Sequence, residues 1–184
     1  MSVTIKKMYE EHAYIGRVVA VLEQQTEYMA EGDAPDYPLM QDIVDYLIDF
    51  PDLVHHKKED VVFAKLLDRN DQLDAIIKEI EEEHKLISSK GHEICTLLED
   101  IVLETVVSRD QVVRQLMQYI DLYKNHLSKE EKELFSLAAH TLSAKDWKGL
   151  NSALPDDEDP IFGKQVKKRY AALYESIIEA SGVV

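Results

Sequence analysis

Val54–Asp60, with the sequence VHHKKED, is the stretch that decides the fold, because Asn125–Glu131, NHLSKEE, repeats its central spacing. In each stretch a histidine is followed four residues later by a glutamate, and side chains at this spacing share one face of an α-helix. The pairs are His55 with Glu59 and His126 with Glu130. A pair of this kind that faces the protein interior supplies half of a metal site. The two stretches therefore predict two helices that each carry two metal ligands.

The repetition extends to a third position. The tripeptide EEH at Glu10–His12 recurs at Glu82–His84. His12 and His84 are 72 residues apart, and the two His/Glu pairs are 71 residues apart. Four histidines and two glutamates thus repeat almost in register, which a chance distribution of seven histidines would seldom produce. We infer an internal duplication in which each copy contributes one histidine from a first helix and a His/Glu pair from the next.

Apolar residues recur every three or four positions along most of the chain, which has only six glycines and five prolines. This pattern predicts an all-α protein. Short polar turns separate four long helices, so we expect an up-down-up-down four-helix bundle over residues 1–142, with sites built from core side chains. The expected helices cover residues 4–29, 39–68, 72–107 and 108–142. Pro51 lies within the second helix and predicts a kink just before His55.

Residues 143–184 are expected to form an additional C-terminal helical segment that packs on the bundle within the same domain. Ser143 is a suitable N-cap for a short helix. Residues 155–160 are rich in Pro and Asp, as loops are, and residues 161–180 carry an apolar stripe that predicts a last helix.

Composition narrows the class of protein. A length of 184 residues is typical of one domain, and a net charge of −15 argues against binding to nucleic acid, whose affinity for proteins depends on Lys and Arg. No apolar run approaches the roughly 18 residues of a membrane span. Cys95 is the single cysteine, and the N-terminus has no apolar signal core, so we expect a cytoplasmic protein without an intrachain disulfide.

Two half-sites predict two metal ions. Imidazoles and carboxylates without a thiolate suit iron, manganese or zinc, whereas magnesium and calcium prefer oxygen ligands alone. We expect the two glutamates to bridge the ions and the histidines to be terminal ligands. The expected ligands are His12, His55, Glu59, His84, His126 and Glu130, with His56 as a seventh. The competing interpretation is a bundle with a buried polar network and no metal.

His56 breaks the duplication, because its counterpart is Leu127. If it is a ligand, the two ions are unlike. Two bridging carboxylates, five histidines and a bridging oxygen would then fill all but one of the positions of two six-coordinate ions. The open position is where a small molecule such as O₂ would bind. Alternatively, His56 faces solvent beside Lys57.

These residues resemble the hemerythrin-like HHE cation-binding domains. The similarity covers about Thr4 to Ala139, and the stretch Asp159–Gly163 is also similar to members of the family. The matching pattern is His12, His55-His56-x-x-Glu59-Asp60, His84 and His126-x-x-x-Glu130-Glu131 with Phe135. The resemblance implies two non-haem iron ions (Fe²⁺/Fe³⁺) with a bridging oxygen species, although other divalent metals are possible. One departure is that oxygen carriers have a histidine four residues after the third-helix ligand, where this chain has Ser88.

Three functions follow from this interpretation. The first is binding of a small diatomic ligand, O₂ or NO, at an open iron site for oxygen, nitric oxide or iron handling or sensing. The second is a di-iron enzyme that reduces peroxide or NO, with Tyr9 or Tyr123 as a proton source. The third is a metal-loaded sensor or interaction protein, of which the sequence names no protein partner. The pattern assigns no catalytic residue, and it is compatible with both a binding protein and an enzyme.

Other polar residues are expected outside the ligand set. Tyr9, Asp52, Glu81 and Tyr123 each precede a ligand histidine by three residues and are candidates to hydrogen-bond its second ring nitrogen. For the tyrosines, an ordinary core role is the alternative. Asp60 and Glu131 are expected at the site's edge or in solvent. His92 and His140 are expected away from the site, and Cys95 as an inert thiol.

Overall fold

The computed structural model describes residues 2–103, 107–154 and 158–180. Every regular element within these ranges is helical, so the predicted all-α class is confirmed. The α-helices are α1 (Val3–Glu31), α2 (Tyr37–Phe50), α3 (His56–Leu67), α4 (Asp74–Val102), α5 (Arg109–Lys129), α6 (Ser136–Thr141), α7 (Ala144–Ala153) and α8 (Ala171–Ala180). The shorter turns are η1 (Pro51–His55), η2 (Asp71–Leu73), η3 (Glu130–Phe135) and η4 (Lys168–Tyr170). None of these helices has both the length and the apolar character to span a membrane.

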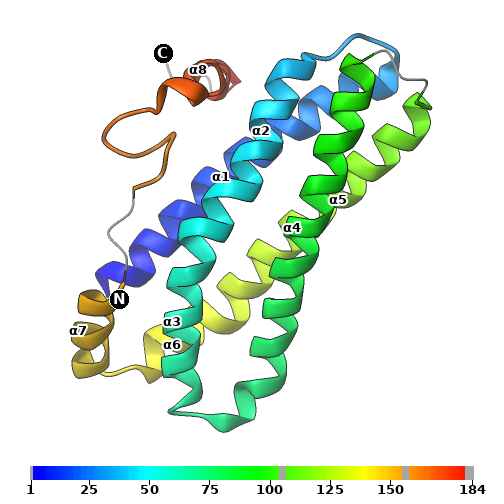
Figure 1. The fold of residues 1–184 in the computed structure, drawn as a ribbon. Coiled ribbons are helices and arrows are strands. Elements are labelled where there is room, and N and C mark those ends of the chain that lie inside the picture. The colour runs from blue at the N-terminus through cyan, green and yellow to red at the C-terminus, as the bar shows by residue number, and fades with distance from the viewer. Residues whose placement is uncertain (1, 104–106, 155–157, 181–184) are drawn as a thin grey trace.

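Four helical arms lie side by side and form the predicted bundle (Figure 1). The first arm is α1, the second is α2 continued through η1 into α3, the third is α4, and the fourth is α5 continued through η3 into α6. The arms α1 and α4 each contact both α2 and α5. Each arm therefore has two neighbours around a shared interior.

Both interrupted arms contain a π-helical turn. In the second arm Pro51 has no N–H to donate, and the turn Pro51–His55 is π-helical. A kink was predicted just before His55, and the irregularity that the structure shows there is this widened turn. The turn Glu130–Phe135 in the fourth arm is also π-helical, but no proline lies in it. Such turns frequently occur at functional sites, and each of these adjoins a His/Glu pair.

The apolar core consists of two clusters of buried residues. One surrounds Ile15, Ile43 and Tyr119, and the other surrounds Met8 and Phe63. Along α1 the first buried apolar residues belong to the second cluster, then comes His12, and then the residues of the first cluster begin. The polar side chains of the site are therefore enclosed between two apolar layers at mid-bundle.

Gly91 lies where α4 closely approaches α2 and α5. An added Cβ would lie 2.7 Å from Cγ1 of Ile48 and 2.9 Å from the hydroxyl of Tyr119, whereas a Cβ at Gly16 in α1 would meet no atom within 4 Å. We predict that Gly91→Ala lowers the free energy of unfolding by about 1–3 kcal/mol through overpacking. Gly16→Ala should raise it by up to about 1 kcal/mol, because alanine is the better helix former. Urea unfolding of both variants tests this, and equal stabilities would contradict the close contact.

The predicted start of the last helix is wrong. A helix was expected over residues 161–180, but α8 begins at Ala171. The carboxylate of Asp159 accepts the backbone N–H groups of Ile161 at 2.7 Å and Phe162 at 2.9 Å, and its carbonyl accepts the N–H of Gly163 at 2.9 Å. These bonds stabilise a turn instead of a helix. The expected helix at Ser143 is present with a capping box to Asp146.

One other boundary also differs from expectation. The third arm was predicted to reach residue 107, but α4 ends at Val102. Residues 104–106, which were predicted to be helical, and residues 155–157, which were predicted to belong to a loop, lie outside the described ranges.

The described part of the C-terminal segment, residues 143–154 and 158–180, contributes buried apolar residues such as Leu173 and Ile177 to the core and also contacts the bundle through polar and aromatic side chains. The buried Tyr46 hydroxyl of α2 donates a 2.8 Å hydrogen bond to the Asp159 carboxylate. The rings of Tyr14 in α1 and Phe162 stack with centroids 4.3 Å apart. Burial raises the pKa of Asp159, while its bonds to the Phe162 and Ile161 N–H groups and to Tyr46 oppose that rise.

We propose that this segment belongs to the same domain as residues 1–142. Asp159→Ala would leave the Tyr46 hydroxyl buried without its acceptor, so we predict a loss of about 1–3 kcal/mol in one transition of the whole chain. Adding Tyr46→Phe to this variant should restore part of the loss, since the unpaired hydroxyl is then gone. Calorimetry measures both. A bundle transition that Asp159→Ala leaves unchanged would instead indicate two independent units.

Candidate metal centre

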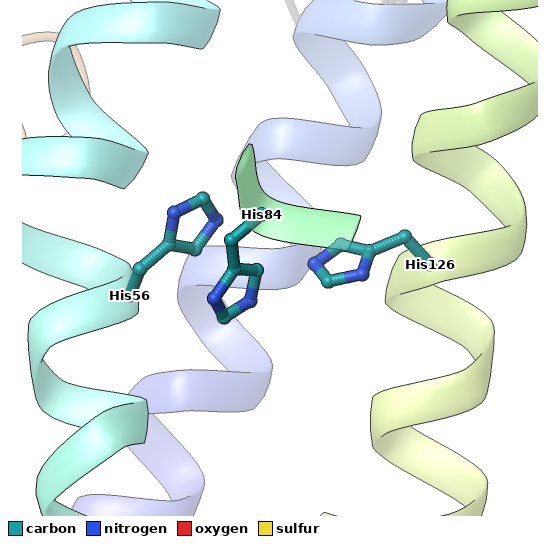
Figure 2. A group of neighbouring side chains, drawn as sticks. All are labelled: His56, His84 and His126. Atoms are coloured by element: carbon teal, nitrogen blue, oxygen red, sulfur yellow. The ribbon is translucent and has the colours of Figure 1, made fainter. Parts of the chain in front are cut away.

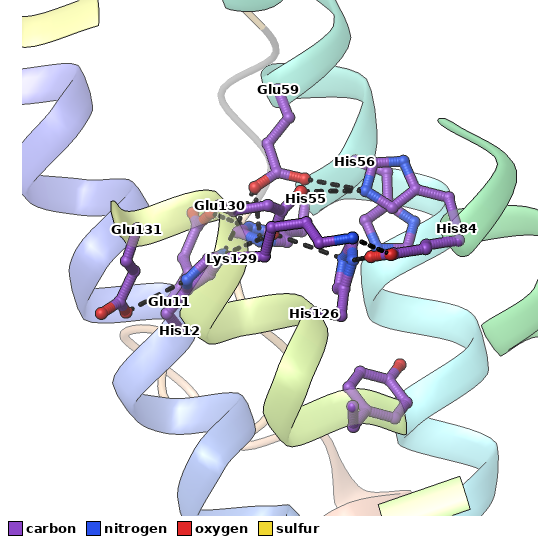
Figure 3. A network of polar contacts seen from close by, with 12 residues as sticks. Glu11, His12, His55, His56, Glu59, His84, His126, Lys129, Glu130 and Glu131 are labelled. Carbon is purple, nitrogen blue, oxygen red and sulfur yellow. Dashed lines mark hydrogen bonds and ion pairs between the residues drawn. The ribbon is translucent and has the colours of Figure 1, made fainter. Parts of the chain in front are cut away.

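The structure brings all seven expected ligands together in the middle of the bundle (Figure 3). Each is buried, and the most exposed, His84, retains only 8% of its accessible surface. The expected ligands are His12 from α1, His55 from η1, His56 and Glu59 from α3, His84 from α4, His126 from α5 and Glu130 from η3. Every arm of the bundle thus contributes at least one side chain, so the site depends on the whole fold.

Glu59 and Glu130 lie at the centre of the site, with the histidine side chains around them. The Nε2 atoms of four histidines lie 3.1 to 3.4 Å from their carboxylate oxygens. His12 and His84 each contact both carboxylates, whereas His55 contacts only Glu59 and His126 only Glu130. The arrangement has the approximate twofold symmetry that the sequence duplication predicts.

Unsatisfied atoms test whether these residues fit a metal. Buried polar atoms in proteins nearly always have a hydrogen-bond partner. In the part of the chain that the structure describes, five buried side-chain polar atoms make no well-directed hydrogen bond. Four of them are potential ligand atoms, and these have only close ion-pair contacts of 3.2 to 3.4 Å with one another's side chains and with His12 and His84. The four are Nε2 of His55, Nε2 of His126, Oε2 of Glu59 and Oε2 of Glu130. Imidazole nitrogens and carboxylate oxygens that gather in one place are suitable ligands for a divalent cation, so these residues fit a metal site.

The ligand atoms form three overlapping groups, each with its atoms within 4.8 Å of one another. The groups are His12, His55 and Glu59; Glu59, His84 and Glu130; and His56, His84 and His126. The first and third groups share no residue, which fits two ion positions with the carboxylates between them. His56 joins the histidines of the second copy although it belongs to the first (Figure 2).

Two glutamates hold ligand histidines from outside. Glu11 contacts Nδ1 of His55 at 2.8 Å and Nζ of Lys58 at 2.5 Å. In the second copy Glu83 contacts Nδ1 of His126 at 3.0 Å and also binds the Lys129 ammonium. Such contacts fix the ring orientation and leave Nε2 for the metal. Glu11 and Glu83 are the middle residues of the duplicated EEH tripeptide, and this repetition is the sequence signal for their shared role. That role was not predicted from the sequence.

The residues that were expected in this outer role behave differently. Asp52 contacts Nδ1 of His56 at 3.3 Å instead of His55, and Glu81 is exposed. The Tyr9 hydroxyl donates to the backbone carbonyl of Glu131 at 3.3 Å. The Tyr123 hydroxyl donates to the carbonyl of Leu47. Both tyrosines therefore bond to backbone rather than to a ligand histidine, in line with the core role given as the alternative.

The remaining polar residues lie where they were expected, at the edge of the site or away from it. Glu131 is at the edge, with its carboxylate 3.2 Å from Nδ1 of His12. His92 is exposed, and His140 bonds to the carbonyl of Ser136 in its own helix. Burial raises the pKa of Cys95 to about 12, so its thiol is unreactive.

The carboxylates and histidines change one another's protonation. Burial disfavours the charged form of His84, but its hydrogen bonds to Glu130 and Glu59 outweigh burial and raise its pKa to about 10. The pKa of His12 is raised well above its ordinary value, since hydrogen bonds to Glu130, Glu131 and Glu59 likewise exceed the effect of burial. Burial opposes ionisation of Glu59, yet the nearby histidines hold its pKa well below the usual range. The metal-free protein therefore pairs imidazolium ions with carboxylates.

Metal binding should consequently release protons. A metal ion takes the nitrogen that carries the proton on His12 or His84, so loading at pH 7 should acidify the solution, and affinity should fall as the pH falls. The contribution of His84 to metal-free stability should be complete below pH 6.5 and disappear as the pH rises through about 10. Calorimetry in buffers of different ionisation enthalpy counts the protons. Loading without proton release would contradict these pairs.

Comparison with known proteins agrees with the geometry. The family model described as the Hemerythrin HHE cation binding domain matches residues 3–138. No solved structure matches the chain. The matched region contains all seven of the residues gathered at the centre, and the chain therefore belongs to the hemerythrin HHE cation-binding domain family.

Proposed function

We propose that the protein holds two non-haem iron ions at this centre and binds a small diatomic ligand, O₂ or NO, at one of them. The observation that carries the proposal is the convergence of buried imidazole nitrogens and carboxylate oxygens from both copies of the duplication, four of which make no well-directed hydrogen bond. Family membership supports cation binding, and the nitrogen and oxygen donors favour iron, manganese or zinc. When bound, iron would supply both Lewis acidity and electrons to the small ligand.

The proposal assigns unequal roles to the two ends of the centre. His12 and His55 would hold one ion, and His56, His84 and His126 would hold the other, with Glu59 and Glu130 shared between them. The ion beside His12 and His55 would have fewer nitrogen ligands. An exchangeable position is therefore expected at that end, as in metal sites that act on small molecules.

The surroundings favour a small apolar ligand. The ring of Phe135 lies 4.7 Å from the His12 ring, and that of Phe50 lies 6.3 Å from the His55 ring, measured between centroids. Both phenylalanines are buried, and so are both histidines. These side chains exclude bulk water from the end that has fewer nitrogen ligands, which protects a reduced centre from uncontrolled reaction.

Rapid mixing tests the proposed function. Iron-loaded, reduced protein would be mixed separately with O₂ and with NO, and the absorption spectrum followed with time. A stable new spectrum that reverses when the gas is removed supports ligand binding. The absence of any spectral response to both gases would overturn the proposal.

One observation favours a second candidate, an enzyme that reduces peroxide or NO. A cavity of about 820 Å³ lies between α1, the end of α7 and residues 158–164, and Glu11 and Lys58 line it. Because Glu11 also contacts Nδ1 of His55, polar groups connect this cavity with the centre. Such a connection could supply protons to a reduction. When peroxide is added as a third reactant in the mixing experiment, repeated consumption of peroxide or NO with oxidation of the iron would favour the enzyme.

We also propose a cytoplasmic location, because the free Cys95 thiol and the ferrous state suit a reducing compartment. Fractionation of cells that express the tagged chain tests this, and recovery outside the cytoplasm would refute it.

A further inference from the structure

Ser88 makes a contact that the metal ligands alone do not explain. It lies one helical turn after His84 on α4, and its hydroxyl donates a 2.6 Å hydrogen bond to Oδ2 of Asp52 in η1. The other oxygen of this carboxylate, Oδ1, lies 3.3 Å from Nδ1 of His56. A continuous polar chain therefore runs from Ser88 on the third arm through Asp52 to His56 on the second arm.

His56, the last residue in this series of polar contacts, is held in a defined position. Its ring stacks on that of His84 with centroids 3.7 Å apart and an interplanar angle of 10°. It stands almost perpendicular to the ring of His126, at 88°. A histidine ligates a metal as the neutral ring, through one of its two nitrogens.

The contact with Asp52 selects the tautomer of the neutral ring. A carboxylate accepts hydrogen bonds, so Nδ1 of His56 carries the hydrogen and Nε2 presents its lone pair. His55 and His126 have the same arrangement with Glu11 and Glu83 on their Nδ1 atoms. Glu131 likewise contacts Nδ1 of His12, so Asp52 is one of four carboxylates that contact the Nδ1 atom of a candidate ligand histidine.

Asp52 differs from Glu11 and Glu83 in the group that binds its carboxylate. Lys58 binds Glu11, and Lys129 binds Glu83, whereas Asp52 is bound by the neutral hydroxyl of Ser88. The Asp52 side chain is 34% exposed, and an exposed carboxylate is mobile unless a second contact fixes it. The Ser88 hydroxyl supplies this contact from a different arm of the bundle.

We propose that Asp52 and Ser88 are positioning residues that fix the ring and tautomer of His56 so that it serves as the third histidine beside His84 and His126. This inference rests on the proposed two-metal centre. Ser88 stands at a position where the oxygen carriers of the family have a histidine. Its hydroxyl would instead stabilise His56, a histidine from the neighbouring arm.

Zinc titration of the metal-free full-length protein tests the inference, because Zn²⁺ suits these donors and is not oxidised. We expect Ser88→Ala and Asp52→Asn to weaken binding of one ion by about 10- to 100-fold, as loss of outer partners of ligand histidines does, and to leave the other ion unchanged. Ser88→Thr keeps the hydroxyl and should retain wild-type affinity. Ser89→Ala changes the adjacent exposed serine and is the matched control.

Nitrogen-15 NMR of zinc-loaded protein provides a second readout, since it distinguishes the two tautomers and metal-bound nitrogens of each histidine. The wild type should show Nδ1–H and metal-bound Nε2 for His56, and Asp52→Asn should disturb this signature for His56 while leaving that of His55. If His56→Leu weakens one ion but Ser88→Ala and Asp52→Asn do not, the positioning role is refuted while the centre stands. If wild-type protein binds no zinc or iron, the proposed centre itself fails.

Discussion

The double variant Glu59→Gln/Glu130→Gln should bind neither iron ion. Both carboxylates are fully buried, and together they contact His12, His55, His84 and His126. Glutamine has nearly the same size but presents a neutral amide, half of which is a donor that cannot ligate a metal. Removing both negative charges also leaves two divalent ions without local compensation in a site of low dielectric constant. The expected metal content therefore falls from two ions per chain to none.

The variant should remain folded because the shapes of the side chains are kept. Circular dichroism checks the fold, and elemental analysis of protein purified from iron-rich medium measures the metal. The matched control is Glu10→Gln/Glu82→Gln, which removes two exposed glutamates from corresponding positions of the duplication. Retention of both ions by the site variant, or their loss from the control, would refute bridging by Glu59 and Glu130.

His56→Leu should separate metal binding from small-ligand chemistry. Leucine is the residue that the second copy carries at the equivalent position, Leu127, so the change makes the two halves alike. The other six ligands remain, and we expect two ions per chain at saturating iron. The ion beside His84 and His126 loses a nitrogen donor, so its affinity should fall and a second exchangeable position should open.

Spectra of the reduced variant with O₂ and NO should therefore differ from those of the wild type in shape and rate. His92→Leu, which changes an exposed histidine of α4, should leave them as in the wild type. Loss of all metal from His56→Leu would contradict its assignment to one ion. Unchanged small-ligand spectra at full metal content would show that His56 is not a ligand.

The sequence was sufficient for the bundle and for the grouping of the seven central residues because both depend on spacing. A His/Glu pair at four residues shares a helix face in any α-helix, and the duplication relates the two halves. Pro51 likewise predicted, from its missing N–H, that the helix is irregular just before His55, although the expected form was a kink and the structure shows a π-helical turn. Each of these features depends on neighbouring residues or on the internal repeat, and both can be read from the sequence.

Features that depend on contacts between distant residues were not predictable in the same way. The π-helical turn at Glu130 has no proline to mark it. The late start of α8 follows from the hydrogen bonds of Asp159. Asp52 was expected beside His55, but the widened turn Pro51–His55 sets the register in which it meets His56 and Ser88. The side of the centre that receives His56 is therefore a property of the assembled fold.

A crystal structure of the iron-loaded protein, with anomalous data collected on both sides of the iron absorption edge, tests the two-metal centre most directly. We expect two iron peaks per chain between Glu59 and Glu130, one beside His12 and His55 and the other beside His56, His84 and His126. A single peak, peaks elsewhere in the molecule, or no anomalous signal from protein shown to be loaded in solution would contradict it.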